Sequence, residues 1–457
     1  MEYFLKKCTG NEMISKNTSK WKRLLQRLKL RECILWLIFL AVVSVSCRAV
    51  SPALKSAFFP NGAAWHWNFF LFSIMFSCGY FVFLLISALF APKWHEVYTS
   101  ETLPECTVLV PAYNEGKHVF DTLTALLASD YPPEKLHITA INDGSQDDTY
   151  FWIMQAQQRS PRISVIDLKK NMGKKYALYQ GMINAEGDII VTVDSDSIVR
   201  RDTLRQLVQP FADIRIGAVA GSITAKHRER NWHVRLLDVM LIFGCDFLRR
   251  AQSSSGNVFC APGALSGYRK SAVLPVAPIW LEQTFMGKPA HIGEDRAIAT
   301  LLLRHNHRVV YQPRAKAETC LPTNYRSVCR MLLRWTRSDI RENILMIPFV
   351  WKWILKPTPR SLILFIHWIA LFINMLLPLI YIPAGLYGLL ITKNMGTYLA
   401  FFVPLQHCGA SSRQQYTSVK NTHSGKRYGH SCLFFMLCWR YPGSIFIRYL
   451  PSTTPIG

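Results

Sequence analysis

Short apolar runs alternate with amphipathic stretches from Cys106 to Val193, and this alternation constrains the fold more than any other feature of the chain. Four runs have the length and β-branched content of buried strands: Thr107–Pro111, Leu136–Ile141, Ile163–Leu168 and Asp188–Val193. Two of the intervening stretches predict helices, Lys117–Ala128 and Lys174–Ala185. Strands that alternate with helices predict an α/β domain with a parallel sheet and helices on both faces.

The pattern continues less regularly as far as Ile340. We expect further strands at Gly217–Thr224, Val258–Tyr268 and Arg308–Gln312. We expect helices around Trp232–Arg250, after Gly293 and over Tyr325–Ile340. The last of these has apolar residues on one side and arginines on the other, which is typical of a helix that lies in a membrane interface.

Acidic residues directly follow two of the predicted strands. Asp143 lies in an Asn-Asp-Gly-Ser motif after the second strand, and Asp194 and Asp196 follow the fourth. Because ligands of parallel sheets bind beyond the carboxyl ends of the strands, this placement predicts a site there. Two carboxylates one residue apart at a strand end can hold Mg²⁺ or Mn²⁺ against a diphosphate; the alternative is a polar turn.

The same strand ends offer groups for a nucleotide. The Asp143 carboxylate can accept the imide N–H of uracil, although its motif also suits a helix cap before Ser145–Trp152. Tyr113 and Glu115 follow the first strand, where they can hold a nucleobase or simply form a polar turn. Lys174 opens a predicted helix, and it either neutralises a phosphate or is a solvated helix start.

Two later motifs have the chemistry to act on an acceptor. Glu294 and Asp295 stand at a predicted helix start, where one carboxylate can be the general base for an attacking hydroxyl. The alternative is the ordinary preference of acidic residues for the first turn of a helix. Arg334 and Trp335 offer a fork for a diphosphate and a flat face for a sugar, but both also serve as interfacial anchors.

The net charge of +24 accompanies apolar segments rather than a nucleic-acid-binding motif. Basic residues crowd the leader before the first apolar segment and the region around the amphipathic helix. This is the positive-inside pattern of a membrane protein, and it argues against nucleic acid as a partner. The twelve cysteines show no metal-binding spacing, so we expect reduced thiols.

Composition divides the chain into six parts. We expect a basic cytosolic leader at 1–32, two transmembrane helices at 33–92, a catalytic domain at 100–320, amphipathic interface helices at 321–358, a C-terminal transmembrane region at 359–405 and an irregular tail at 406–457. The tail is either flexible or the product of an altered reading frame. This layout predicts a multi-pass integral protein of the plasma (inner) membrane with a cytoplasmic catalytic domain.

From about Cys106 to Ser338, the ordered motifs resemble the processive family 2 glycosyltransferases of membranes. That family includes hyaluronan synthases, nodulation chitooligosaccharide synthases, chitin synthases and cellulose synthases. Cys260–Arg269 is similar to the Cys-…-Gly-Pro-Leu-Gly-Met-Tyr-Arg segment of the hyaluronan and chitin-oligomer branch, and Gly293–Arg296 to its Gly-Glu-Asp-Arg. The resemblance implies a GT-A-like domain that binds a nucleotide sugar.

The resemblance also implies roles for individual residues. It makes Asp295 the catalytic base and Asp196 the metal ligand, with Mg²⁺ or Mn²⁺ as cofactor. Together with the interpretations above, it places these residues at the nucleotide sugar: Tyr113, Glu115, Asp143, Lys174, Asp194 and Arg334. The residues expected at the acceptor are Gly263, Tyr268, Arg269, Glu294 and Trp335. The chain departs from the family's Gln-x-x-Arg-Trp motif, because Met331 stands in the place of Gln.

We therefore expect a membrane-embedded inverting enzyme that moves N-acetylglucosamine, alternating with glucuronate or not, from a UDP-sugar to a growing polysaccharide of the hyaluronan or chitin-oligomer type. Its expected partners are the UDP-sugar, a glycan or lipid acceptor and membrane lipids. The first alternative is a non-processive transferase that glycosylates a membrane lipid, which Met331 and the loss of apolar segments after Leu405 favour. The second is an inactive membrane scaffold, against which the four intact aspartates argue.

Overall fold

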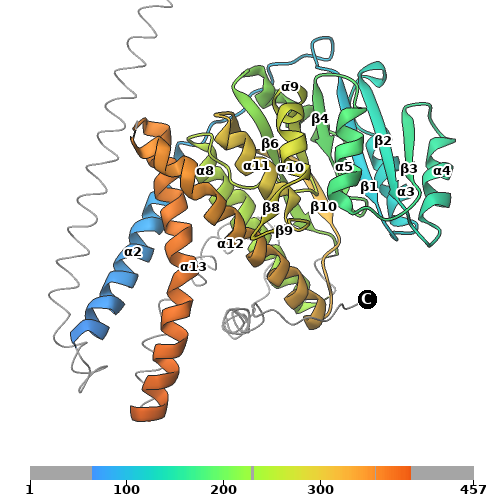
Figure 1. Cartoon of the computed structure of the whole chain (residues 1–457). Coiled ribbons are helices and arrows are strands. Elements are labelled where there is room, and N and C mark those ends of the chain that lie inside the picture. Colours follow the sequence, from blue (N-terminus) through green and yellow to red (C-terminus); the bar gives the residue numbers. More distant parts are fainter. Residues whose placement is uncertain (1–63, 228–230, 356, 393–457) are drawn as a thin grey trace, which may run out of the picture. The chain divides into compact units, whose positions relative to one another are not determined.

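The computed structural model describes residues 64–227, 231–355 and 357–392 (Figure 1). Residue contacts divide the chain into two compact units, and the described residues Ser87–Ile382 form the unit that holds the sheet. Every candidate site residue named above belongs to this unit. The expected leader, the expected first transmembrane helix and the tail 406–457 lie outside the described residues.

The centre of this unit is an eight-stranded sheet with the order β3-β2-β1-β4-β7-β6-β10-β5. Its strands are β1 (Cys106–Ala112), β2 (Leu136–Asp143), β3 (Ile163–Leu168), β4 (Ile189–Thr192), β5 (Ile198–Val199), β6 (Ile216–Ala225), β7 (Ser266–Arg269) and β10 (Arg308–Thr319). A separate antiparallel pair consists of β8 (Thr284–Phe285) and β9 (Lys288–Pro289).

The sheet is mixed, so the prediction of a parallel sheet is confirmed only in part. β1 pairs in parallel with β2 and β4, and β2 pairs in parallel with β3. β7, however, runs antiparallel to both of its neighbours, β4 and β6. The expected strand Val258–Tyr268 is wrong over most of its length, because only Ser266–Arg269 is strand. Val258 and Phe259 are buried in the core, and this burial explains the apolar run.

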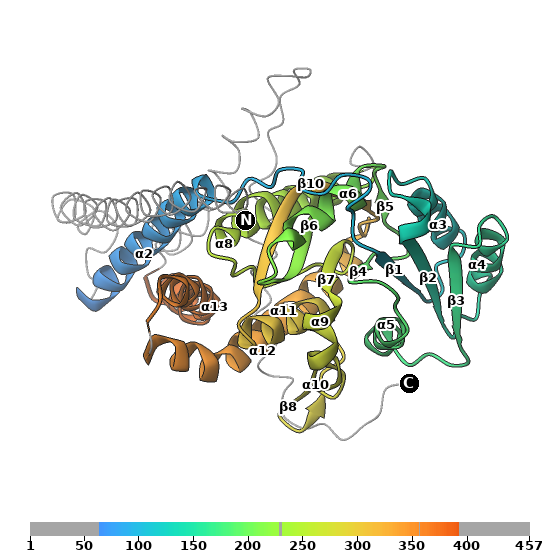
Figure 2. The ribbon, with the colours of Figure 1, turned by 90° about the horizontal axis from the view of Figure 1, so that it is seen from above.

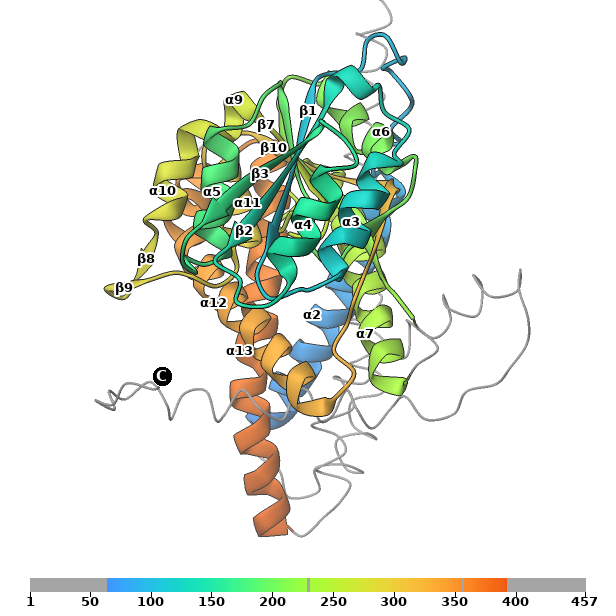
Figure 3. The same cartoon turned by 90° about the vertical axis from the view of Figure 1, so that its right-hand side faces the viewer.

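Helices cover both faces of the sheet (Figures 2 and 3). One face carries α3 (His118–Leu127), α4 (Thr149–Gln157) and α6 (Thr203–Val208), and the other carries α5 (Lys174–Ile183), α9 (Lys270–Val273), α10 (Ala277–Leu281) and α11 (Glu294–Arg304). Side chains of β1 alternate between the two cores: Val108 and Val110 pack on the first face and Leu109 on the second. The predicted α/β arrangement with helices on both faces is confirmed.

The remaining helices are longer than the sequence suggests. The expected helix around Trp232–Arg250 consists of α7 (Trp232–Ile242), a π-helical segment (Phe243–Arg249) and α8 (Arg250–Ser253). The amphipathic helix α12 (Tyr325–Leu355) continues 15 residues past the expected end at Ile340. Short 3₁₀ turns lie at Pro133–Lys135, Gln209–Ala212 and Leu274–Val276.

Two apolar helices correspond to expected membrane segments. α2 (Ala64–Leu89) has 26 residues and contains no charged side chain, and most of it belongs to the other compact unit. α13 (Pro359–Thr392) continues through Pro383–Gly385 without a break. Within the described residues, one stretch is long and apolar enough to cross a membrane, Pro359–Leu376 at the start of α13. The expected multi-pass arrangement therefore stays a prediction.

One arginine fastens the first turn of α13 to the sheet unit. Arg360 donates from Nε to Oδ1 of Asn257 (3.0 Å), from Nη1 to the Asn306 carbonyl (3.0 Å) and from Nη2 to the His307 carbonyl (2.6 Å). Two turns later Trp368 is buried in the core beneath the sheet, where its Nε1 donates to a backbone carbonyl of α12. The beginning of this apolar helix is thus part of the folded domain.

Candidate active site

The two strand-end motifs lie at one edge of the sheet. Asp143 ends β2, and the residues just after β4 include Asp194 and Asp196. The two strands flank β1 in parallel, with Ala112 paired to Asn142 near the carboxyl end. Parallel strands end at the same edge, so the order of strands places these carboxylates around a common opening.

Asp143 holds the loop that leads into α5. Its two carboxylate oxygens accept the N–H groups of Met172 (2.8 Å) and Gly173 (2.9 Å). The expected helix cap is not formed by this motif, because α4 begins only at Thr149; Oδ1 of Asn142 accepts the N–H of Ser145 (3.1 Å) in the turn before it. A carboxylate offers about four acceptor positions, so Asp143 retains room for an imide N–H. Burial raises the pKa of Asp143, although the two backbone hydrogen bonds oppose it.

Lys174 connects the two acidic motifs that are farthest apart in the sequence. Its Nζ lies 2.5 Å from Oδ1 of Asp194 and 3.2 Å from Oε1 of Glu294. Burial alone would lower the pKa of Lys174, but the two carboxylates outweigh burial and raise it above its usual value. Of the two interpretations of Lys174, this geometry favours a permanent cation inside the site over a solvated helix start.

Negative charge accumulates beside this lysine. Burial, together with Asp196 and Asp194, raises the pKa of Glu115 to about 7. Burial and the neighbouring Asp194 also raise the pKa of Asp196, whose Oδ1 accepts from the hydroxyls of Thr319 (3.2 Å) and Ser197 (3.2 Å). A bound cation would lower these raised pKa values, because its positive charge offsets the repulsion between the neighbouring carboxylates.

A divalent metal at Asp196 would need oxygens from the substrate. In the part of the chain that the structure describes, no three His, Cys, Asp or Glu side chains converge to hold a metal. Mg²⁺ commonly binds through about one or two carboxylates, with phosphate oxygens and water completing its coordination. Asp196, at the edge of the sheet next to Asp194, fits a metal of that kind.

The candidate base Asp295 lies in the first turn of α11. Its Oδ1 accepts the N–H of Arg296 (2.8 Å), and its Oδ2 accepts from Sγ of Cys260 (3.4 Å). Burial and the adjacent Glu294 raise the pKa of Asp295, whereas Lys174 overcomes burial and lowers the pKa of Glu294. Environments that push two neighbouring pKa values apart are typical of an acid–base site, because they give the two groups different protonation states.

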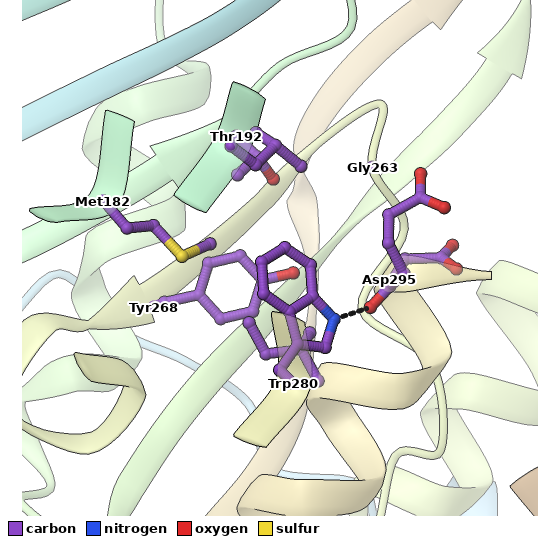
Figure 4. Close-up of a pocket in the computed structure, with 9 residues that line it drawn as sticks. Met182, Thr192, Gly263, Tyr268, Trp280 and Asp295 are labelled. Atoms are coloured by element: carbon purple, nitrogen blue, oxygen red, sulfur yellow. Dashed lines mark hydrogen bonds between the residues drawn. The ribbon is translucent and has the colours of Figure 1, made fainter. Parts of the chain in front are cut away.

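A cavity of about 10 Å³ lies beside these two carboxylates (Figure 4). Tyr268, Trp280, Thr192 and Met182 line it, and Trp280 supports the helix start by donating from Nε1 to the Glu294 carbonyl (2.9 Å). A volume of about 10–15 Å³ holds one water molecule, so a sugar has to approach Asp295 from another side. Trp280 could not be predicted as a site residue, because it stands on the short helix α10 and belongs to no motif.

Gly263 brings the loop before β7 against the donor side of the site. A Cβ at this position would lie 2.7 Å from Nζ of Lys174 and 3.3 Å from Oδ1 of Asp194. Tyr268 is buried and lines the cavity beside Asp295. Both of these residues expected at the acceptor therefore lie in or beside the site.

Arg269 is not brought to the site, contrary to expectation. Its Nε and Nη2 donate to the carbonyls of Ile216 (3.1 Å) and Phe211 (2.5 Å). Because β7 is antiparallel to β4, Arg269 pairs with Ile189, at the end of β4 that is remote from Asp194. Its position corrects the expected acceptor role to a structural one.

Three expected residues lie at the surface of the site. Arg334 is exposed on α12, near enough to Glu294 to contribute to the lowering of its pKa. Trp335 is 36% exposed on the same helix, and Tyr113 is 40% exposed just after β1. Exposed rings can receive a ligand, so these positions are compatible with stacking on a sugar and a nucleobase.

Glu115 should make the stability of the metal-free protein depend on pH. Because the pKa of Glu115 is raised from 4.5 to about 7 in the folded state, the unfolded chain loses this proton first as the pH rises. Stability should therefore fall between pH 4.5 and 7 for wild type. In Glu115→Gln this part of the fall should be absent, and in the exposed control Glu318→Gln it should remain. Thermal unfolding midpoints without divalent metal test this; equal slopes for wild type and Glu115→Gln would contradict it.

Residues 107–274 match the family described as Glycosyl transferase family 2. The chain is 34% identical over 244 residues to an N-acetylglucosaminyltransferase of Azorhizobium caulinodans, covering 53% of this chain and 61% of that protein. It is 32% identical over 256 residues to an N-acetylglucosaminyltransferase of Rhizobium meliloti, covering 56% of this chain and 60% of that protein. The chain thus spans less than two thirds of the length of each of these two relatives, 61% of the first and 60% of the second.

The fold also has a solved counterpart. A mannosyltransferase from Pyrobaculum calidifontis, in complex with GDP-Man and Mn²⁺, superposes with a TM-score of 0.50 at 18% identity, covering 77% of this chain and 90% of that one. At this identity the likeness concerns the fold alone. The matched family segment runs from β1 to α9 and includes the strand-end aspartates. Residues 107–274 are thus similar to the family 2 glycosyltransferases, and the fold has a GT-A-like mixed sheet.

Proposed function

We propose that this chain is an inverting, UDP-sugar-dependent transferase that adds N-acetylglucosamine, with or without alternating glucuronate, to a growing glycan. One observation carries the proposal: Lys174 joins the strand-end carboxylate of Asp194 to the helix-start pair Glu294 and Asp295. Lys174 thereby links the edge of the sheet proposed to bind the donor with the helix start that carries the candidate base. The two N-acetylglucosaminyltransferase relatives support N-acetylglucosamine as the donor sugar.

On the donor side, the proposed contacts follow from charge and hydrogen-bonding capacity. The free acceptor positions of Asp143 receive the uracil imide, and Tyr113 stacks on the base. Lys174 and Arg334 face the diphosphate, whose negative charge replaces part of the carboxylate charge around the lysine. Asp194 lies between Lys174 and the ribose-diphosphate and orients both.

A divalent cation held at Asp196 and the diphosphate oxygens would act as a Lewis acid and stabilise the leaving UDP. The raised pKa values of Asp196 and Glu115 support this position, because excess negative charge there is available to a cation. The structural counterpart from Pyrobaculum calidifontis was solved with Mn²⁺.

On the acceptor side, Asp295 takes the proton from the attacking hydroxyl. Its raised pKa makes it a better base at neutral pH than an ordinary carboxylate, because catalytic efficiency rises as the pKa approaches the operating pH. Glu294 stays ionised beside Lys174, where it orients the acceptor by accepting from its hydroxyls. Trp335 supplies a flat face for the terminal sugar. Attack from the side opposite the leaving UDP inverts the anomeric centre.

We also propose that the enzyme is an integral protein of the plasma (inner) membrane, with the catalytic unit on the cytoplasmic side. The start of α13 is long and apolar enough to span a bilayer. On α12, Trp351 and Leu355 are 65% and 70% exposed, which suits the apolar side of an interfacial helix. The lysines and arginines of the leader and of α12 support cytoplasmic placement.

A second candidate is transfer to a membrane lipid, with a product of one or two sugars. Met331, which stands in place of the family's Gln, packs against the apolar cluster of Leu237 and Val328. A thioether packed in this way cannot hydrogen-bond a diphosphate as an amide does. This observation favours a transferase that releases its product early over one that holds a long polymer.

UDP release by the purified chain in detergent with Mn²⁺ tests both candidates. We expect release with UDP-N-acetylglucosamine, and its loss on chelation of the metal. Release that requires UDP-glucuronate as well would identify a hyaluronan-type synthase. Release with the first donor alone, with a lipid-extractable product, would select the lipid transferase. Absence of release in protein that still binds UDP would contradict the proposed activity.

A further inference from the structure

A second cavity, of about 350 Å³, lies between α10, α11 and α12. This volume equals roughly ten water molecules at about 30 Å³ each and falls at the lower end of ligand pockets, about 300–1,000 Å³. Its polar lining consists of Glu282, Gln283, Thr300, Arg304 and Glu342, and apolar side chains including Ile279 complete the wall.

This cavity is separate from the candidate active site. Asp295 lies in the first turn of α11, whereas Thr300 and Arg304 follow five and nine residues later. At about 1.5 Å per residue, they lie roughly 8 and 14 Å farther along the helix axis. The cavity beside Asp295 and this cavity have no lining residue in common.

Two side chains that line the cavity each hold a buried acceptor atom without a donor among the described residues. Glu342 is fully buried, and its Oε1 accepts from Nε of Arg341 (2.9 Å) and from Nε2 of Gln283 (3.1 Å). Its Oε2 and the Oε1 of Gln283 are buried without a hydrogen-bond partner among the described residues. Unpaired buried acceptors are costly, so this wall is suited to a ligand that donates hydrogen bonds.

The charges around the cavity disfavour a cationic ligand and the unpaired acceptors disfavour an anionic one, which leaves a neutral ligand. The carboxylate of Glu342 is already balanced by Arg341, which lies against its other oxygen. At the exposed rim, Glu282 and Arg304 carry opposite charges. Close by, Lys175 is a further cation, whose Nζ donates to the Ala290 carbonyl. A cationic ligand would therefore meet more positive than negative charge.

We propose that this cavity binds a neutral sugar unit of a glycan, at a site remote from the reacting groups. Hydroxyls of a pyranose donate to the two unpaired acceptors of Glu342 and Gln283. The C–H face of the ring packs on the apolar wall formed by Ile279 and Leu345. The proposal concerns binding alone and does not depend on which sugar the active site transfers.

Binding of N,N′-diacetylchitobiose to the full-length chain in detergent, without nucleotide, tests this site by ligand-detected NMR titration. A Trp335→Ala background removes the proposed acceptor contact of the active site. Gln283→Met deletes an acceptor at nearly constant size, and Leu345→Trp fills the cavity. Each should weaken disaccharide binding by about 10-fold or more, as expected for the loss of a buried hydrogen-bond partner or of the space itself.

The matched control is Gln158→Met, the same change at an exposed position after α4, which should bind as the parent does. Ethanolamine, a small cation, tests the alternative of a cationic ligand, and it should not compete with the disaccharide. Three outcomes would each overturn the proposal. The first is that the parent does not bind the disaccharide, the second that both cavity variants bind it as tightly as the parent does, and the third that ethanolamine displaces it. UDP release by Gln283→Met in the otherwise wild-type chain should stay within about twofold, because Gln283 lies outside the active site. Release and disaccharide binding therefore report separately on the proposed activity and on this site.

Discussion

Replacing Asp295 with asparagine should lower the rate of UDP release by about 10³-fold, within the range of about 10²–10⁴-fold that general bases contribute. Asparagine matches the carboxylate in size, and its Oδ1 can still accept the N–H of Arg296. The fold and UDP binding should therefore survive, while the group that removes the hydroxyl proton is lost. Rates at saturating donor, together with the affinity for UDP, measure the two effects separately.

Asp188→Asn provides the matched control for this substitution. Asp188 is exposed just before β4, at the end of the strand opposite to Asp194. Its variant should retain the wild-type rate. A rate for Asp295→Asn within tenfold of wild type would contradict the assignment, and a large loss in Glu294→Gln would then make Glu294 the base.

Replacing Gly293 with alanine should destabilise the catalytic unit by about 3 kcal/mol, the sum of overpacking and of an unfavourable backbone conformation. Gly293 has φ +73°, and an added Cβ would overlap Oγ of Ser338 on α12. The two helices cannot separate freely there, because Nη2 of Arg341 donates to the Ile292 carbonyl (2.6 Å). Thermal unfolding in detergent and UDP release should both report the damage.

Gly287 offers a control that isolates the backbone contribution. Its φ is +74°, but no atom lies within 4 Å of an added Cβ. Gly287→Ala should therefore show only the smaller conformational cost, about 1 kcal/mol. The double variant Gly293→Ala/Ser338→Gly should recover part of the lost stability. If Gly293→Ala unfolds at the same temperature as Gly287→Ala, the helix contact is not tight.

The first half of the sheet could be predicted because its signals are local. Each strand from β1 to β4 is a compact apolar run followed by a polar turn, and Ile163–Leu168 matches the structure residue for residue. β7 could not be predicted, because it is a four-residue strand whose direction depends on distant neighbours. Burial of Val258 in a loop imitates a strand, since apolar content reports burial rather than backbone geometry.

Some residues of the candidate site could likewise be placed from local sequence, whereas other contacts depend on the folded chain. Asp143 and Asp194 could be placed because strand ends in a parallel sheet determine their edge. The contact of Lys174 with Glu294 joins residues that only the folded chain brings together. Arg269 was misplaced because the resemblance covers Cys260–Arg269 as one segment and implied one location for all of it. Because β7 runs antiparallel to β4, however, each successive residue of β7 lies farther from the opening beside Asp194 than the one before it.

The hydrogen bonds of Arg360 affect where a shorter, crystallisable version of the protein should end. Deleting everything from Pro359 onward would look natural, since apolar sequence begins there. Such a cut would also remove the three hydrogen bonds of Arg360 and expose the core surface that Trp368 covers. An end point beyond Phe372 keeps both, and detergent or surface substitutions on the outer side of α13 would then supply solubility.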